Sequence, residues 1–151
     1  GKKLEEDSFR SSLVKLDFFS LLETWSSETS EVDLPNYQHF SSLRKNQRKA
    51  RRNSGGIIFY FKNELAKFIK RESSTSEDIL WIRISKELFG LSRDIFIGNV
   101  YISPMYSSIH KRAEESIFDV LEQDIARFAS RGYVILGGDF NSRIGSLKDF
   151  A

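Results

Sequence analysis

The sequence contains no cysteine, and it has only two prolines and two histidines among 151 residues. Without cysteine, neither a disulfide framework nor a thiolate metal site can form. His39 and His110 lie far apart in the sequence, so oxygen ligands and a hard cation such as Mg²⁺ remain the favoured metal chemistry. The longest apolar run, residues 55–61, is too short to cross a bilayer, and no basic segment followed by an apolar one opens the chain. We therefore expect an intracellular protein, nuclear or cytoplasmic, with no membrane partner.

Aromatic residues are plentiful, because 13 phenylalanines, five tyrosines and two tryptophans occur in a chain that is 40% hydrophobic and 29% charged. Such side chains bury large areas, so the composition predicts a single globular domain with a substantial core. The formal net charge of +2 says little about partners by itself. Because the chain begins at Gly1 and stops shortly after Gly145, both ends look cut.

Basic residues are concentrated in one short tract, which holds six of them within nine positions: Arg44, Lys45, Arg48, Lys49, Arg51 and Arg52. Asn46 and Gln47 inside the tract, and Asn53 and Ser54 after it, favour a loop. The simplest interpretation of this basic tract is a solvated loop. The alternative is that it contacts the phosphate backbone of a nucleic acid.

The pattern of apolar residues predicts an α/β chain. An amphipathic helix is expected over residues 4–16, and strands over 18–22, 37–41, 55–61, 79–84 and 95–102, with 65–70 as the hairpin partner of the third strand. These short-linked strands suggest an antiparallel meander. A long helix capped by Ser107 or Ser108 and stopped by Gly132 then leads into residues 133–136, which read as a strand buried on both faces. The helix would serve as a crossover that brings this strand beside an earlier one.

Polar side chains stand where two of the predicted strands end. Glu23 follows residues 18–22, and Asp139 and Asn141 follow residues 133–136 and a glycine pair. Ligands gather outside the carboxyl ends of strands in open α/β sheets, so the two carboxylates are expected to converge. If the chain stays extended, the side chains of Asp139 and Asn141 point the same way. The simpler alternatives are an ordinary turn after the strand and a surface acid at Glu23.

Five segments together resemble the endonuclease/exonuclease/phosphatase family, and within it the endonuclease domain of LINE-type non-LTR retrotransposons. In family order they are Leu21-Leu22-Glu23-Thr24-Trp25, Ser54-Gly55-Gly56-Ile57-Ile58-Phe59-Tyr60, Ile79-Leu80-Trp81-Ile82-Arg83-Ile84, Asn99-Val100-Tyr101-Ile102-Ser103-Pro104, and Val134 through Gly145. One such segment would be weak support, whereas five in order carry the resemblance over most of the chain.

The resemblance implies a two-sheet α/β sandwich with helices outside, and Mg²⁺-dependent cleavage of DNA phosphodiesters by an activated water, with Mn²⁺ as an alternative cation. In the family pattern Glu23 is similar to the metal carboxylate, and Asp139 to the residue that orients or deprotonates the water. Asn141 would hold the phosphate or the attacking water, and Tyr101 would contact the phosphate. From its strand alone, Tyr101 could equally be a core aromatic. Apurinic-site endonucleases, lipid or inositol phosphatases and sphingomyelinases are the related enzymes that these residues do not separate.

The chain also departs from the family pattern. It lacks the family's opening strand and its C-terminal half, so residues 1–151 are expected to be a partial domain that supplies about the first half of the sandwich and is inactive alone. If each half supplies one sheet, the chain should expose an apolar face and associate with itself or with a complementing C-terminal half. The alternative function is that of a non-catalytic remnant that binds nucleic acid or another partner.

Overall fold

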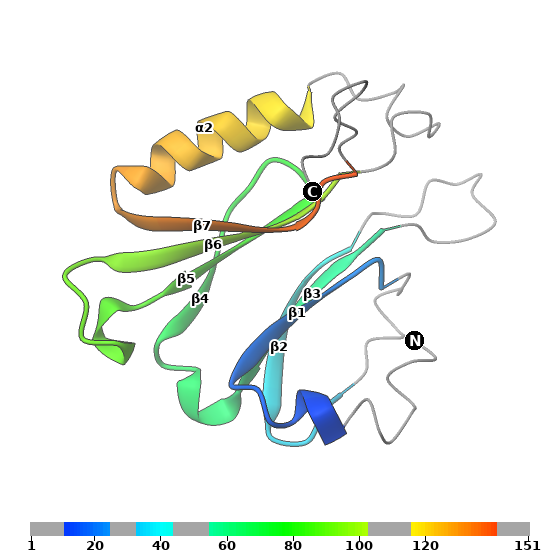
Figure 1. The fold of residues 1–151 in the computed structure, drawn as a ribbon, viewed down its shortest axis with the longest axis vertical. Coiled ribbons are helices and arrows are strands. Elements are labelled where there is room, and N and C mark those ends of the chain that lie inside the picture. The colour runs from blue at the N-terminus through cyan, green and yellow to red at the C-terminus, as the bar shows by residue number, and fades with distance from the viewer. Residues whose placement is uncertain (1–10, 25–32, 44–54, 103–115, 142–151) are drawn as a thin grey trace, which may run out of the picture.

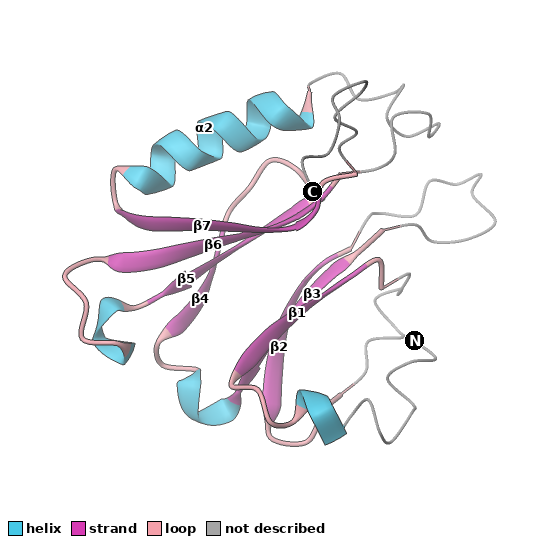
Figure 2. Cartoon of the chain, in the orientation of Figure 1, coloured by secondary structure: helices cyan, strands magenta, loops and turns pink. Residues whose placement is uncertain are grey.

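The computed structural model describes residues 11–24, 33–43, 55–102 and 116–141. They form two β-sheets that face each other, and helix α2 (Ile117–Ala129) lies on the outer face of the second sheet (Figures 1 and 2). The first sheet has the order β1 (Phe18–Leu22), β3 (Ile57–Lys62), β2 (Tyr37–Ser42), and its pairings are antiparallel. The second has the order β4 (Ile69–Glu72), β5 (Ile79–Ile84), β6 (Asp94–Tyr101), β7 (Gly132–Asp139), in which β6 and β7 pair in parallel.

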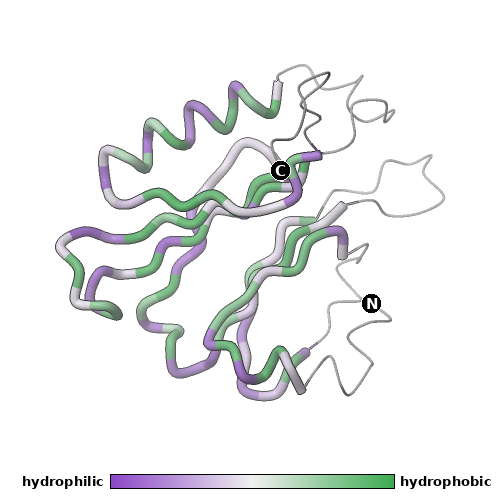
Figure 3. Tube along the Cα trace, in the orientation of Figure 1, coloured by the Kyte–Doolittle hydropathy of each residue, from purple (hydrophilic) through white to green (hydrophobic). Residues whose placement is uncertain are grey.

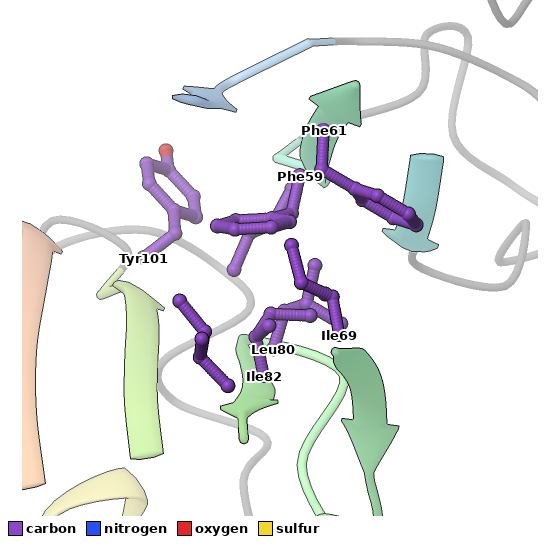
Figure 4. Close-up of a cluster of buried hydrophobic side chains, with 8 residues drawn as sticks. Phe59, Phe61, Ile69, Leu80, Ile82 and Tyr101 are labelled. Atoms are coloured by element: carbon purple, nitrogen blue, oxygen red, sulfur yellow. The ribbon is translucent and has the colours of Figure 1, made fainter. Parts of the chain in front are cut away.

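The main hydrophobic core lies between the two sheets. β3 contributes Ile57, Phe59 and Phe61, and β5 contributes every second residue, Leu80, Ile82 and Ile84, because alternate side chains of a strand point to opposite faces of the sheet. Ile79 and Trp81, on the other face of β5, pack with residues of α2. Figure 3 shows hydrophobic residues running along the strands of both sheets, and Figure 4 shows side chains of β3 and β5 meeting. Both sheets are therefore built from this chain, and the expectation that it supplies only one of them was wrong.

The link from β3 to β4 carries the chain from one sheet to the other. After β3 it forms the 3-10 helix η2 (Asn63–Leu65), and Leu65 and Phe68 pack against the core between the sheets. β4 then pairs with β5, so the predicted hairpin of residues 65–70 with the third strand was wrong. The meander is confirmed for β4, β5 and β6, and another 3-10 helix, η3 (Lys86–Leu88), lies between β5 and β6. In the first sheet, however, β3 lies between β1 and β2.

Helix α2 is the predicted crossover between β6 and the parallel strand β7. Its N-cap is Ser116, whose hydroxyl accepts a hydrogen bond from the Phe118 amide, whereas Ser107 and Ser108 lie outside the described residues. The helix ends at Ala129. Gly132 does not stop it; it begins β7, where a Cβ would lie 2.2 Å from the Asp94 carbonyl oxygen. Glycine is needed there because β7 approaches β6 closely.

Asp124 joins α2 to the sheet beneath it. Its carboxylate is 7% exposed and accepts hydrogen bonds from the Trp81 indole at 2.8 Å, the Ser74 hydroxyl at 2.8 Å and the Arg127 guanidinium at 2.7 Å. Trp81 is fully buried and its ring packs on Phe128, with 4.6 Å between the ring centroids. This arrangement satisfies the polar end of a buried tryptophan.

Strand β7 is an edge of the second sheet as far as the structure describes the chain. Tyr133 is 46% exposed, Ile135 51% and Leu136 38%, so the prediction of a strand buried on both faces was wrong. The cause is position, because an edge strand has a neighbour on one side only. In the described part of the chain, no helix is long and apolar enough to cross a bilayer.

Candidate active site

Three strands end together at one edge of the sandwich. β6 and β7 run in parallel, and their register places Tyr101 opposite Asp139. β1 ends at Leu22 in the facing sheet, and the next residue, Glu23, accepts a hydrogen bond of 2.5 Å from the Tyr101 hydroxyl to its Oε1 atom. The structure thus brings together Glu23, Tyr101 and Asp139, which the sequence selected from three separate segments.

Glu23 has a backbone conformation that glutamate rarely adopts. Its φ of +50° lies in the left-handed region, and the next residue, Thr24, donates its amide to the Gly56 carbonyl at 3.3 Å. A non-glycine residue in this region costs on the order of 1 kcal/mol, and such strain is concentrated at functional sites. The turn directs the exposed Glu23 side chain to the Tyr101 hydroxyl, which a continued strand would not do.

Tyr101 combines the two roles that the sequence left open. It is 6% exposed, and its ring belongs to the core between the sheets beside Phe59 (Figure 4). Its hydroxyl oxygen points away from Leu80 and Ile82 in the same view. The residue is a core aromatic by its ring, and its hydroxyl belongs to the site.

Asp139 and Asn141 form a turn, so the expectation that the chain stays extended there was wrong. The Asp139 carboxylate accepts a hydrogen bond from the Asn141 amide at 3.0 Å, and Asn141 has a φ of +43°. The Asn141 side chain donates to the Ile102 carbonyl at 2.9 Å, and the Ile102 amide donates to the Asp139 carbonyl at 2.8 Å. The turn therefore holds Asn141 against the end of β6, next to Tyr101.

The two glycines before Asp139 differ in what they allow. Gly138 has a φ of +151°, and a Cβ there would lie 1.9 Å from the Val100 carbonyl oxygen, so only glycine lets β7 approach β6 at this point. A Cβ on Gly137 would meet nothing within 4 Å. The close approach of β7 to β6 therefore requires glycine at position 138 and not at position 137.

The described residues offer few ligands for a metal ion. They contain no group of three or more histidine, cysteine, aspartate or glutamate side chains that could hold one. Mg²⁺ usually keeps several waters and takes one or two protein carboxylates together with substrate phosphates. The exposed Glu23 carboxylate, held by the Tyr101 hydroxyl, fits that kind of open site.

Two polar residues beneath the site were not identified from the sequence. Asn99 is 5% exposed; its amide donates to the Leu80 carbonyl at 3.0 Å, and its carbonyl oxygen accepts a hydrogen bond from the Ser20 hydroxyl. The signal was available, because Asn99 stands two residues before Tyr101 in a strand and so shares its face.

The basic tract Arg44, Lys45, Arg48, Lys49, Arg51 and Arg52 lies outside the described residues. The described residues on either side of it can be placed. β2 ends at Ser42, which pairs with Ile57 at the start of β3, and Ile57 also pairs with Leu22. The tract therefore connects two points at the same end of the first sheet as Glu23.

The chain has a mixed α/β fold with two β-sheets that resembles the endonuclease/exonuclease/phosphatase type, as the sequence predicted. No protein-family model and no curated protein matches the sequence. Among solved structures, the chain is similar to the human Nocturnin catalytic domain with bound sulfate anion, with a TM-score of 0.56 and 14% sequence identity. The match covers 95% of this chain and 60% of the Nocturnin chain, so this chain spans less than two thirds of that length. At this identity the likeness concerns the fold alone.

Proposed function

We propose that this chain is part of a Mg²⁺-dependent endonuclease domain of the LINE retrotransposon type, which cleaves DNA phosphodiesters. The chain alone is proposed to be inactive. The observation that carries the proposal is the meeting of Glu23 and Tyr101 across the two sheets, with Asp139 in register beside Tyr101. Strand ends are where ligands bind in α/β folds, and a carboxylate held in a strained backbone conformation supports function there.

Each side chain has a chemical task in this proposal. Glu23 would hold Mg²⁺, which would supply Lewis-acid stabilisation of the phosphoryl oxygens. Asp139 orients the attacking water and accepts its proton in this proposal, since the residue ends β7 in register with Tyr101. When substrate binds, the Tyr101 hydroxyl donates a hydrogen bond to a phosphate oxygen in place of its bond to Glu23. Asn141 is held at the end of β6 by its bond to Ile102, where an amide can hydrogen-bond the phosphate or the water.

DNA is the proposed substrate, and the retrotransposon assignment rests on the five ordered sequence segments. The Nocturnin catalytic domain was solved with a bound sulfate, a tetrahedral anion of the same shape as phosphate, which supports a phosphate-binding site in this fold. The described residues that flank the basic tract, Ser42 and Ile57, lie at the sheet end that carries Glu23, which favours a polyanionic substrate.

The test combines a binding measurement with an activity measurement. Mn²⁺ titrated into isotopically labelled protein should selectively broaden the NMR signals of Glu23, Tyr101 and Asp139, and Glu23→Gln should abolish the effect. Glu122→Gln, an exposed carboxylate on α2, is the matched control and should leave the broadening unchanged. Plasmid nicking in Mg²⁺ should require a form extended to the length of a complete domain, and Asp139→Ala should abolish it.

Two results would contradict the proposal. Broadening spread evenly over acidic residues would show that these side chains do not form a metal site. Nicking by the extended form that survives both Asp139→Ala and EDTA would show that the chemistry lies elsewhere.

The second candidate function is a non-catalytic nucleic-acid-binding module, favoured by the six basic residues between Leu43 and Gly55. Its binding to DNA would need no Mg²⁺ and would weaken with salt. Replacing Arg48, Lys49 and Arg51 by glutamine should lower the slope of log affinity against log salt by about 3, close to one unit per phosphate contact. An unchanged slope would exclude the tract as the contact surface.

A further inference from the structure

The space between the two sheets is apolar except for a few polar links at the end that carries the site. The Ser42 hydroxyl donates to the Glu77 carbonyl at 2.8 Å, the Tyr101 hydroxyl donates to Glu23, and the Ser20 hydroxyl donates to Asn99. The last of these has no assigned role. It joins β1 to β6, the two strands that carry Glu23 and Tyr101.

The placement of this pair follows from strand geometry. Asn99 lies two residues before Tyr101, so the two side chains leave β6 on the same face. Ser20 alternates with Phe18 and Leu22, which pack against the core between the sheets. Only Leu21 and Leu22 separate it from Glu23. The Asn99 amide is fixed to the Leu80 carbonyl of β5, so its carbonyl oxygen is presented to the facing sheet in a single orientation.

Stability alone does not explain this polar pair, in which Asn99 is buried and Ser20 is partly buried. Asn99 is 5% exposed and lies beside a core of isoleucine, leucine and phenylalanine side chains. Replacing both members of a buried hydrogen-bonded pair by apolar groups of the same shape is often close to neutral for stability. Apolar contacts are non-directional and leave the sheets free to shift by small amounts. A hydrogen bond between β1 and β6 instead sets one relative position of the two strands.

We propose that Asn99, together with Ser20, is a positioning residue that fixes β1 against β6 so that the Glu23 carboxylate meets the Tyr101 hydroxyl. Its importance for catalysis rests on the proposed function, but its effect on Tyr101 does not. Asn99 acts through the backbone of β6, and no contact with substrate is assigned to it.

The experiment reads the hydrogen bond of Tyr101 directly. The protein is labelled with ¹³C at the ζ carbon of tyrosine, Tyr101→Phe assigns its signal among the five tyrosines, and Glu23→Ala defines the shift without the bond. Asn99→Leu and Ser20→Ala should each move the Tyr101 signal more than halfway to the Glu23→Ala position. They should also weaken Mn²⁺ binding about 10-fold, the scale typical of groups that orient a metal ligand.

Two further variants separate positioning from a general loss of packing. Ser42→Ala removes another buried hydrogen bond between the sheets and should leave the Tyr101 signal unchanged. Ser20→Thr keeps the hydroxyl and should restore the wild-type signal. If Asn99→Leu fails to fold, Ser20→Ala decides the question, because it leaves the bond from Asn99 to Leu80 in place.

The outcomes are distinct. A Tyr101 signal that stays at its wild-type position in Ser20→Ala, or that Ser42→Ala moves as far, overturns the proposal. A signal that responds to Asn99 in a protein that binds no Mn²⁺ upholds the positioning role and refutes the metal-dependent function.

Discussion

Removing the Asp124 carboxylate, which lies on helix α2 and outside the candidate site, should destabilise the protein strongly. Asp124→Ala leaves the indole N–H of the fully buried Trp81 without its partner and also deprives Ser74 of one. Hydrogen bonds to a charged group contribute about 1.5–3 kcal/mol each when buried. The bond from Arg127 adds at most about 1 kcal/mol, because the Arg127 side chain is 44% exposed. Because the Ser74 bond is only partly buried, we expect a total loss near the lower end of this sum, about 3–4 kcal/mol in the free energy of unfolding.

Urea denaturation followed by tryptophan fluorescence measures this loss. Trp81 becomes the sole reporter in a Trp25→Phe background, since the chain has two tryptophans. Asp124→Asn keeps one acceptor oxygen and should cost only about 1–2 kcal/mol. The matched control is Glu122→Ala, an exposed carboxylate on the same helix, with an expected change within about 0.5 kcal/mol. A loss for Asp124→Ala no larger than that of the control would refute the role assigned to this network.

Three further predictions concern other parts of the molecule. Gly138→Ala should lower the free energy of unfolding by about 3 kcal/mol or more, because the new Cβ would meet the Val100 carbonyl, whereas Gly137→Ala should be tolerated in the same denaturation assay. The side-chain hydrogen bond with Asp17 raises the pKa of Lys62 above its ordinary value of 10.5. The stabilisation of the folded state by this pair is therefore present below pH 10.5 and is lost as the pH rises through the raised pKa. Asp17→Asn should return this pKa toward the ordinary value in a ¹⁵N NMR titration, and an unchanged titration would contradict the cause. We expect the exposed edge strand β7 to promote self-association, so Ile135→Lys should reduce association measured by sedimentation velocity; a variant that associates as much as the wild type would contradict this expectation.

Strands with strong local patterns were predictable from the sequence. The runs at 57–62 and 79–84 are rich in β-branched and aromatic residues, and in β5 the alternation also identified the two faces. What could not be predicted were the neighbours of each strand. The apolar residues of β7 read as buried because a local run does not reveal that the strand lies at an edge. The switch between sheets at residues 63–68 depends on the distant pairing of β4 with β5, which short-range patterns do not encode.

The site was predicted in part for the same reason. A carboxylate at the end of an apolar run is a local signal, and the structure places the two carboxylates that it selected, Glu23 and Asp139, next to Tyr101. The turn at Asn141 was weighed as the simpler alternative, and it proved to be the means by which Asn141 reaches β6. Asn99 shares a strand face with Tyr101, but the sequence does not show which residue it contacts, and so its role was missed. Its partner Ser20 lies 79 positions away in the sequence.

The hydrogen bond between Tyr101 and Glu23 crosses from one sheet to the other, and neither residue's own ladder includes it. A small separation of the sheets would break this hydrogen bond while the backbone hydrogen bonds within each sheet stayed intact. Far-UV circular dichroism and amide exchange would then record a folded protein, because both report backbone structure. The proposed metal binding would therefore report tertiary order, and conditions that loosen side-chain packing should abolish it well before the strands themselves melt.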